Sequence, residues 1–345
     1  MTTAASPTVH HRNNLDAVRL GAAMLVLVSH SHALTGRTEY RYLSWTPLGQ
    51  LGVYIFFAIS GYLVIESWRR DPNLVRFLAR RSLRIFPGLA VCVGLSAFVL
   101  GPLVSTLPAG EYYRHPATYA YLWNIALSPV FALPGVFETN VLPNAVNGSL
   151  WSLPVEFAMY LVVAGIGLVR ANRWTSLFLA VVSAALAAFW AARYRDMVVV
   201  YGTDLRQLAI CGVFFWSGAA FRDFGVIRWF SLPRVVIAML IVLALQPWPE
   251  VARASAWVLL PAIVLSFGLA ESPWLVRFTQ SGDYSYGLYI YAFPVQQVVA
   301  ATWPALPLAA YVAVVTGGAL ACAVLSWHLI EAPALRLKPR VPRLS

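Results

Sequence analysis

Apolar runs of membrane-spanning length recur from one end of this chain to the other. About 20 predominantly apolar residues suffice for a helix to cross the hydrocarbon core of a bilayer, and ten runs of that kind can be counted. Inside a bilayer only helices and closed barrels satisfy every backbone hydrogen bond. We therefore predict an all-α, polytopic transmembrane helix bundle with about ten spans. The runs lie at 15–36, 48–68, 85–106, 149–169, 174–193, 206–222, 232–248, 255–270, 284–303 and 308–330.

The composition fits one membrane-embedded bundle with short flanking tails. Hydrophobic residues make up 59% of the 345 residues and charged residues only 11%, whereas about 25% of a soluble domain is charged. The transmembrane domain is predicted to cover 15–331, between a tail at 1–14 and a basic tail at 332–345. Because Asp16 and Arg19 lie in the first turns of the first run, we interpret that run as an uncleaved helix and not as a signal peptide.

The basic residues between the runs predict the orientation. With ten spans, most of the 25 Lys and Arg residues fall on the side that receives both tails and the loop 69–84. Cytoplasmic segments carry an excess of basic residues, so both termini are predicted to be cytoplasmic and the protein to lie in the inner (cytoplasmic) membrane. Topology thereby explains the formal net charge of +11 without a nucleic-acid partner.

The connection 107–148 is the only long one and is predicted to form an outer loop. It contains five prolines around an apolar stretch at 117–133. That stretch either lies at the interface or dips into the membrane, which gives ten or eleven spans. An eleventh span would break the charge asymmetry, which favours ten.

Arg19 and His30 are ionisable residues inside the first apolar run. Placing a charged side chain in hydrocarbon is costly, so such residues commonly mark functional sites. At about 100° per residue, the two lie within about 20° of each other around the helix and about 16 Å apart along its axis. His32 points away from this stripe. The pattern suggests that both residues line one reaction path, with Arg19 nearer the cytoplasm and His30 farther along it.

A carboxylate, Glu156, lies inside the fourth run. Under the predicted topology Glu156 lies roughly 10 Å below the outer surface and His30 roughly 22 Å above the inner one. These depths add up to about the core thickness of roughly 30 Å, which places the two residues level. A carboxylate beside a histidine orients it and raises its basicity, which suits a general base acting on a hydroxyl. The alternative is that each is simply a polar residue satisfied between helices.

The inner loop 69–84 holds six arginines in 16 residues. Arg81 and Arg84 are three positions apart and so share one face of a short helix. Together with Arg80, they are predicted to bind phosphate groups at the membrane surface, since guanidinium groups pair well with phosphate. The alternative is that the loop is basic only because topology requires it.

Other residues have more ordinary predicted roles. Ser60–Gly61 is a small pair that permits close helix approach. Asp283 suits a helix cap at the start of the ninth run, and His328 and Glu331 are predicted to pair. The three cysteines lie in apolar stretches without metal-ligand spacing, so no metal site is predicted.

Trp151 and Asn147 precede the fourth run on the predicted outer side. They are candidate contacts for an acceptor substrate, with the Trp151 indole as a stacking surface. The alternative for Trp151 is the commoner one, in which a tryptophan anchors the helix at the membrane interface.

Four segments, in this order, resemble the acyltransferase-3 family of integral membrane acyltransferases, and they span nearly the whole chain. The first carries Arg19 and His30, the second Arg81 and Arg84, and the third Glu156. The segments are LDAVRLGAAMLVLVSHSHALTG; LGVYIFFAISGYLV with FLARRSLRIFP; NGSLWSLPVEFAMYL; and SGDYSYGLYIYAFPVQQ with a closing SWHLIEAP.

The resemblance implies transfer of an acyl group, usually acetyl, from cytoplasmic acyl-CoA to a hydroxyl of an extracytoplasmic or lipid-linked glycan. It also implies that His30 is the catalytic base or acyl relay, and that Arg19 and the Arg81–Arg84 pair contact CoA. Glu156 would assist His30 at the reacting centre.

One position departs from the family pattern. Many relatives carry a histidine in the ninth helix two residues before its proline, where this chain has Ala292. The role of that histidine would be absent here or taken by a neighbour such as Tyr289 or Tyr291.

Two other functions compete with a membrane O-acyltransferase. A transporter or exporter of a glycan or lipid precursor would use Arg19, His30 and Glu156 as a proton relay. Many transporters contain inverted repeats with matching broken helices, and no such halves are visible in this sequence. A receptor or scaffold would leave the three ionisable residues unexplained. The expected partners are therefore the acyl donor, a glycan acceptor and membrane lipids.

Overall fold

Helices form nearly all of the structure. The computed structural model describes residues 13–192 and 198–339. Parts of both predicted tails, at 1–12 and 340–345, lie outside the described residues. The long helices are α1 (Leu15–Leu34), α2 (Leu48–Arg70), α3 (Leu74–Leu95), α7 (Ser152–Leu168), α8 (Trp174–Ala192), α9 (Leu205–Phe224), α10 (Leu232–Ala244), α11 (Pro249–Leu269), α13 (Ser285–Thr302) and α14 (Leu308–Ser326).

Short elements join or extend these helices. The two short strands, β1 and β2, pair antiparallel as one hairpin. The short elements are η1 (Ser96–Leu100), α4 (Gly101–Val104), α5 (Ala109–Arg114), α6 (Pro116–Ala120), η2 (Tyr121–Ala126), η3 (Gly148–Trp151), β1 (Val199–Val200), β2 (Thr203–Asp204), η4 (Val226–Trp229), α12 (Pro273–Thr279), η5 (Trp327–Glu331) and α15 (Ala332–Arg336).

Each of the ten predicted runs overlaps one of the long helices. Among the described residues, seven helices are long and apolar enough to cross a membrane, and α10 is a shorter apolar helix. The predicted all-α membrane bundle is therefore confirmed. The helices α9 and α13 are more polar, and many of their residues are buried against other helices. The total of ten spans stays a prediction.

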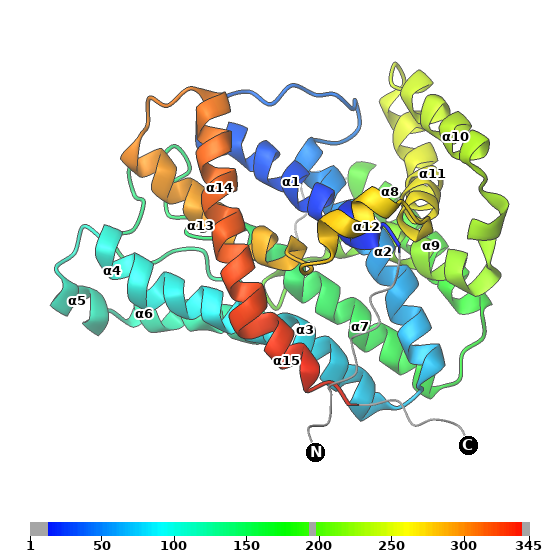
Figure 1. Cartoon of the computed structure of the whole chain (residues 1–345), viewed down its shortest axis with the longest axis horizontal. Helices are drawn as coiled ribbons and strands as arrows, with labels where there is room; N and C mark the ends of the chain where they lie inside the picture. The colour runs from blue at the N-terminus through cyan, green and yellow to red at the C-terminus, as the bar shows by residue number, and fades with distance from the viewer. Residues whose placement is uncertain (1–12, 193–197, 340–345) are drawn as a thin grey trace.

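The helices α1 and α2 pack against each other near the centre of the bundle (Figure 1). α2 also packs against α7, α9 and α11, and α13 lies between α1 and α14. The helix α14 runs across the front in Figure 1 and continues through the π-helical turn η5 into α15, which packs on α3. Asn13 and Lys338, near the two ends of the described chain, line the same cavity. The two ends therefore meet on one side of the bundle, as an even number of spans requires.

Two glycines allow α2 and α9 to cross in close contact. A Cβ atom at Gly61 would lie 1.8 Å from the Phe215 carbonyl oxygen, and one at Gly218 would lie 2.1 Å from the Ala58 carbonyl oxygen. The two backbones therefore approach each other where any larger side chain would collide. The predicted role of the Ser60–Gly61 pair is confirmed.

The helix α3 begins eleven residues earlier than predicted, at Leu74 instead of 85. The Asn73 side chain accepts a hydrogen bond from the Arg76 amide and caps the helix. The Asp71 carboxylate accepts from Arg76 at 2.5 Å and from Arg80 at 2.7 Å. These bonds, first that of Arg76 and then that of Arg80, hold the pKa of Asp71 well below its ordinary value. The predicted short helix that carries Arg81 and Arg84 is thus the first part of α3, and of the predicted loop 69–84 only 71–73 lie outside a helix. Arginine is a good helix former, and Asp71 neutralises part of its charge.

The connection 107–148 contains no helix long enough to span a bilayer. Its apolar stretch 117–133 folds as the short helices α6 and η2 followed by irregular chain, and η2 packs against α3. This segment is too short to add an eleventh span.

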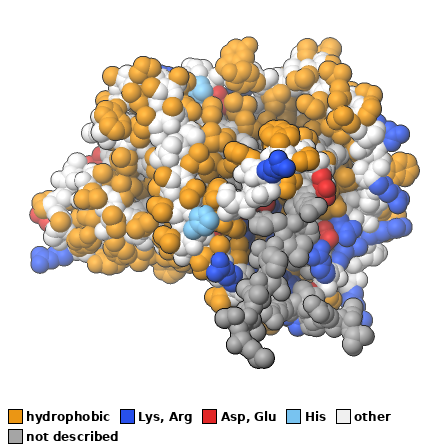
Figure 2. All heavy atoms as spheres, in the orientation of Figure 1, with side chains coloured by type: hydrophobic (Ala, Val, Ile, Leu, Met, Phe, Trp, Pro, Cys, Tyr) orange, Lys and Arg blue, Asp and Glu red, His pale blue; other side chains and the backbone are white. Residues whose placement is uncertain are grey.

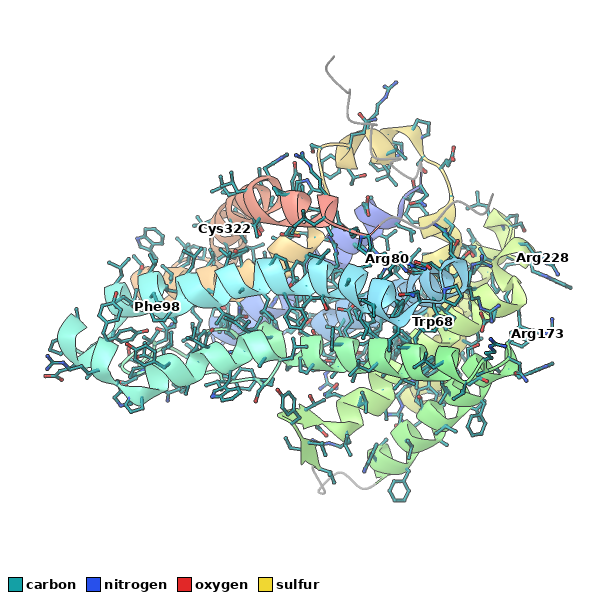
Figure 3. All side chains as sticks on the ribbon, turned by 90° about the horizontal axis from the view of Figure 1, so that it is seen from below. Trp68, Arg80, Phe98, Arg173, Arg228 and Cys322 are labelled. Atoms are coloured by element: carbon teal, nitrogen blue, oxygen red, sulfur yellow. The ribbon has the colours of Figure 1, made fainter. Side chains whose placement is uncertain are left out.

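The molecular surface has an apolar belt and a basic end. Figure 2 shows hydrophobic side chains over most of the visible face, with Lys and Arg mainly toward its lower and right-hand edges. Exposed large apolar side chains are frequent on α8, α10 and α14, as lipid contact requires. In Figure 3, Arg80, Arg173 and Arg228 lie toward one end of the molecule and Phe98 toward the other. The basic end is the predicted cytoplasmic side.

Candidate active site

A cavity of about 760 Å³ opens at the basic end and reaches into the bundle between α1, α2, α3, α7 and α13. We call it the arginine cavity. It brings together five of the residues predicted for the site from three separate sequence segments. These residues are Arg19, Arg80, Arg81, Arg84 and Glu156.

Two of the arginines share one carboxylate. Arg84 Nη2 lies 2.5 Å from Asp283 Oδ2, and Arg19 Nη1 lies 3.6 Å from the same oxygen. Burial by itself would raise the pKa of Asp283, but the charges of Arg84 and Arg19 and hydrogen bonds from Ser285 lower it to about 2. The predicted cap is confirmed, since Asp283 accepts from the Ser285 amide. Asp283 also has a second role, holding two cations of the cavity in place, that the sequence did not reveal.

The other two arginines keep unused donors. Arg80 is 8% exposed, and its Nε and Nη2 find no hydrogen-bond partner among the described residues. Arg81 lies over the rings of Phe77 and Tyr160, at 6.0 and 5.8 Å, and forms only a long hydrogen bond of 3.4 Å to Ser67. A guanidinium that stacks on aromatic faces keeps its edge free for an anion.

Lys338 is a further cation of the cavity, beside five arginines that include Arg70, and nothing in the sequence indicated its place there. It follows α15 and lines the arginine cavity, although its side chain keeps solvent access. Partial burial, and then repulsion from Arg84, Arg81, Arg19 and Arg80, lowers the pKa of its ammonium to about 8. Lys338 lies more than 200 residues from the arginines in sequence, so only the fold could reveal this proximity.

The inner end of the cavity is built around Glu156. Its Oε1 accepts hydrogen bonds from Tyr160 at 2.6 Å and Ser60 at 2.9 Å. Beside it, the Tyr289 hydroxyl donates to the Ser149 carbonyl and lies 2.6 Å from the Ser152 hydroxyl. The end of the cavity is therefore polar and well ordered, with a carboxylate and several hydroxyl groups.

His30 lies beyond this end, outside the lining of the arginine cavity. Its ring packs edge-on against Phe293 at 5.2 Å. Phe293 follows the cavity-lining Tyr289 by one turn of α13, about 6 Å. The rings of Phe56 and Tyr289 are in contact, with centroids 5.8 Å apart. Since both line the cavity, they form its boundary on the side toward His30.

The expected pairing of His30 with Glu156 is not present. Glu156 is bonded to Ser60 and Tyr160, and the buried Nδ1 of His30 has no hydrogen-bond partner among the described residues. Glu39 is instead the carboxylate close enough to interact electrostatically with His30. The depth estimate placed two residues at similar heights but could not tell which faces of their helices meet.

Glu39 is held in place by two hydrogen bonds. Its carboxylate accepts from the Ser29 hydroxyl at 2.8 Å and from the Leu48 amide at the start of α2 at 2.9 Å. It lies in the polar connection just after α1. In the sequence, its sole distinguishing feature is that it is the one acidic residue among several arginines and tyrosines of this connection.

His32 and Ala292, the two other positions considered for a histidine role, lie in different environments from His30. The His32 Nδ1 lies 3.0 Å from the Val28 carbonyl of its own helix, whereas the His30 ring packs against Phe293. Ala292 is buried in a cluster with Ala23 and Leu27 of α1, where a histidine would need additional space.

Of the two predicted acceptor contacts, Asn147 is completely buried. Its amide donates to the Ile290 carbonyl, and its oxygen accepts from the Ser149 amide. Asn147 therefore ties η3 to α13 and lines neither the arginine cavity nor the pocket that contains Trp151. Trp151 is half-exposed and lines the second pocket.

The predicted pairing of His328 with Glu331 is not present. His328 contacts the Tyr284 hydroxyl, whereas Glu331 accepts a hydrogen bond from Ser326 and lies 4.0 Å from Arg84. Within residues 13–192 and 198–339, no cluster of His, Cys, Asp or Glu side chains could hold a metal ion.

Comparison with known proteins identifies the family. The acyltransferase domain model of the acyltransferase-3 family matches residues 12–328. An O-acetyl transferase of Shigella phage Sf6 is 32% identical, over 94% of this chain and 96% of the phage protein. Nodulation protein 10 of Rhizobium leguminosarum bv. viciae is 28% identical, over 95% and 94% of the two chains.

A third relative matches only in part. Peptidoglycan O-acetyltransferase OatA of Listeria monocytogenes is 27% identical over 43% of this chain, and the match covers 23% of that protein. No solved structure matches significantly. The family model and the phage relative both cover nearly the whole chain. Both support an acyltransferase and not the alternative hypothesis of a transporter. The chain is therefore an integral membrane O-acyltransferase that belongs to the acyltransferase-3 family.

Proposed function

We propose that this protein transfers an acetyl group from cytoplasmic acyl-CoA to a hydroxyl of a cell-surface or lipid-linked glycan. The observation that carries the proposal is the arginine cavity. It gathers six basic side chains at the predicted cytoplasmic side and ends at a polar cluster. Tyr289 of this cluster lies one turn of α13 from Phe293, whose ring contacts His30.

The charge of the cavity fits the phosphate groups of CoA. Arg19 and Arg84 already share Asp283, whereas Arg80 and Arg81 hold donor groups without partners among the described residues. Buried donors without partners cost free energy, and a phosphate would satisfy them with charge-assisted hydrogen bonds. A nucleotide thioester would thus find its phosphate site preformed.

The depth of the cavity fits the pantetheine arm. Arg19 and His30 lie about 16 Å apart along α1, a distance that an extended arm covers. The arm would run from the arginines past Ser60 and Glu156 and bring the thioester to the Phe56–Tyr289 boundary. The acetyl carbonyl would then face His30.

In the proposed reaction His30 acts as a general base. Its imidazole takes the proton of the sugar hydroxyl while that oxygen attacks the thioester carbonyl. The C–S bond breaks, an ester forms, and the CoA thiolate leaves and is protonated. The carboxylate of Glu39 stabilises the imidazolium that forms. Such a base typically contributes about 10²–10⁴-fold to the rate.

Glu156 acts in this scheme as a positioning residue. It holds Ser60 and Tyr160 at the end of the cavity, and Tyr160 in turn stacks against Arg81. This arrangement connects the phosphate end of the donor site with the thioester end.

The proposed acceptor follows from the relatives and from the predicted topology. One relative is named for peptidoglycan O-acetylation, and a hydroxyl on the outer side would reach His30 without entering the arginine cavity. The reaction would therefore join a cytoplasmic donor to an extracytoplasmic acceptor in the inner membrane.

The donor half is tested by binding of labelled acetyl-CoA to the purified protein. We expect Arg81→Gln to weaken binding at least tenfold. Arg228→Gln, an exposed arginine that does not line the cavity, serves as the control and should bind normally. Equal binding by the wild type, Arg81→Gln and Arg80→Gln would contradict the assignment of the cavity to CoA.

A further inference from the structure

A second pocket, of about 330 Å³, lies at the opposite end of the bundle from the arginine cavity. We call it the Trp151 pocket. Its wall combines the start of α2, the end of η3, the β1–β2 hairpin and the start of α9. The lining side chains that carry the argument are Gln50, Trp151, Thr203, Asp204 and Gln207.

The distance between the two pockets can be estimated along α2, which contributes residues to both. Arg70, near its end, lines the arginine cavity, whereas Gln50, near its start, lines the Trp151 pocket. Twenty residues of helix correspond to about 30 Å, the thickness of a bilayer core. The two pockets therefore open on opposite sides of the membrane.

Two contacts connect the wall of the Trp151 pocket with residues next to His30. Gly49, the neighbour of Gln50, packs against Ser29, the neighbour of His30: a Cβ at Gly49 would lie 2.8 Å from Ser29 Oγ. Gly148, in the same short helix as Trp151, packs on the Phe293 ring, which contacts His30. A molecule in this pocket would thus lie near the general base.

The chemistry of the pocket is neutral, polar and aromatic. Gln50 Nε2 donates to Gln207 Oε1 at 3.1 Å, which links α2 to α9 and leaves the Gln207 amide nitrogen without a partner among the described residues. Asp204 is already paired with Arg206. The pocket therefore offers amide and hydroxyl groups around one half-exposed indole, without an uncompensated charge on Asp204.

The hairpin that closes the pocket is fixed by local geometry. Gly202 has a φ of +68°, a left-handed value that glycine adopts without strain, and a Cβ there would lie 2.7 Å from Pro129. Tyr201 also donates to the Ala126 carbonyl. The connection 107–148 thus holds Thr203 against the pocket.

We propose that the Trp151 pocket binds one uncharged sugar residue of the acceptor glycan. The apolar face of the sugar ring would stack on Trp151, and its hydroxyl groups would exchange hydrogen bonds with the Gln50, Thr203 and Gln207 side chains. This assignment rests on the proposed function and adds a location for the acceptor. The sugar hydroxyl that reacts would be on the bound residue or on its neighbour, within reach of His30.

The experiment measures the transfer of labelled acetyl from acetyl-CoA to a glycan fraction isolated from cells that lack the gene. The fraction is added at graded concentrations to membranes that contain the wild type or a variant. We expect Trp151→Ala to raise the apparent KM for glycan at least tenfold and to leave the KM for acetyl-CoA unchanged. Trp151→Phe should restore most of the acceptor affinity because it keeps a ring.

Trp123→Ala is the matched control, since Trp123 is exposed in η2 and does not line the pocket. Gln207→Leu, similar in size but unable to hydrogen bond, should raise the glycan KM by at least threefold. Wild-type glycan KM values in Trp151→Ala and Gln207→Leu would overturn the pocket assignment and leave the proposed function standing. Absence of label in the glycan with the wild-type protein would overturn the proposed function and this assignment with it. Unchanged donor binding by each variant shows that it is folded.

Discussion

Asp283 is the counter-charge for two cations of the donor site, Arg84 and Arg19. With a pKa of about 2, it stays ionised throughout the pH range in which the enzyme would work. The stabilisation from its lowered pKa is present above the ordinary aspartate pKa and is lost only as the pH falls toward 2. This pairing therefore contributes no pH dependence near neutrality.

We expect Asp283→Asn to lower the free energy of unfolding by about 2 kcal/mol. Arg84 loses its short ion pair, and Arg19 keeps only Asp16 as a carboxylate partner among the described residues. Glu250→Gln, in a strongly exposed pair with Arg253, is the control and should cost no more than about 0.5 kcal/mol. Thermal unfolding of both variants in detergent measures the difference. Equal midpoints for the two variants would contradict the role given to Asp283.

Lys338 is expected to introduce a pH dependence into donor binding. Its pKa is about 8 in the free protein, so the ammonium is charged below that pH and neutral above it. The charges that lower this pKa are those of Arg84, Arg81, Arg19 and Arg80. The cavity that Lys338 lines also contains the acidic side chains Asp16, Glu66, Glu156 and Asp283. Binding of acetyl-CoA should therefore weaken severalfold, about 1 kcal/mol, as the pH rises from 7 to 9.5.

Two substitutions separate this effect from a structural one. Lys338→Arg stays charged and should abolish the decrease, whereas Lys338→Gln should bind weakly at both pH values. The same decrease in Lys338→Arg would show that another group titrates.

At the scale of single residues, the sequence predicted most of the basic residues that gather at the donor site, but not the acidic residues that pair with them. Spacing within one helix placed Arg19 below His30 and put Arg81 and Arg84 together, because helical geometry is local. Glu39, Asp283 and Lys338 come from other segments, and their contacts depend on how helices face one another. The rotation of Glu156 about α7 turns it toward Ser60 and Tyr160 and not toward His30.

The crossing of α2 and α9 depends on glycines, because the two backbones lie too close for a side chain between them. We expect Gly61→Ala to destabilise the protein by several kcal/mol or to prevent folding, since its Cβ would meet the Phe215 carbonyl oxygen at 1.8 Å. Gly165→Ala in α7 is the control, because a Cβ there meets nothing within 4 Å and alanine favours helix by about 1 kcal/mol. Detergent-solubilised yield and unfolding temperature report the outcome. Native-like stability of Gly61→Ala would contradict the contact.

At the scale of helices, the sequence predicted where they are but not all of their ends. Apolar length gives the part of a helix that lies in hydrocarbon, whereas α3 continues beyond it because Asn73 caps it and Asp71 binds its arginines. Conversely, α10 ends at Ala244, although the apolar run continues to Trp248. The start of α3 is thus set by polar contacts outside the apolar run.

The whole molecule is predicted to place the arginine cavity and the connection 107–148 on opposite sides of the membrane. Single cysteines at Thr139 and at Asn172, both at exposed positions, test this with a thiol reagent that does not cross membranes. We expect Thr139→Cys to react in intact cells and Asn172→Cys only after permeabilisation. The native cysteines are buried or half-buried, so the unsubstituted protein gives the background. The reverse labelling pattern would invert the proposed topology.

The arrangement of the whole molecule also explains how one enzyme could serve two compartments. A cationic cavity reaches from one side to the Phe56–Tyr289 boundary, the Trp151 pocket opens on the other side, and His30 lies next to the surroundings of both. The central claim is that His30 carries out the transfer between them.

The most direct test is the transfer of labelled acetyl from acetyl-CoA to glycan in membranes containing the wild type, His30→Ala or His32→Ala. Our account predicts that His30→Ala binds acetyl-CoA normally but loses at least 100-fold in transfer, as the loss of a general base implies, while His32→Ala stays within about threefold of the wild type. Full transfer by His30→Ala, with loss in His32→Ala, would contradict it.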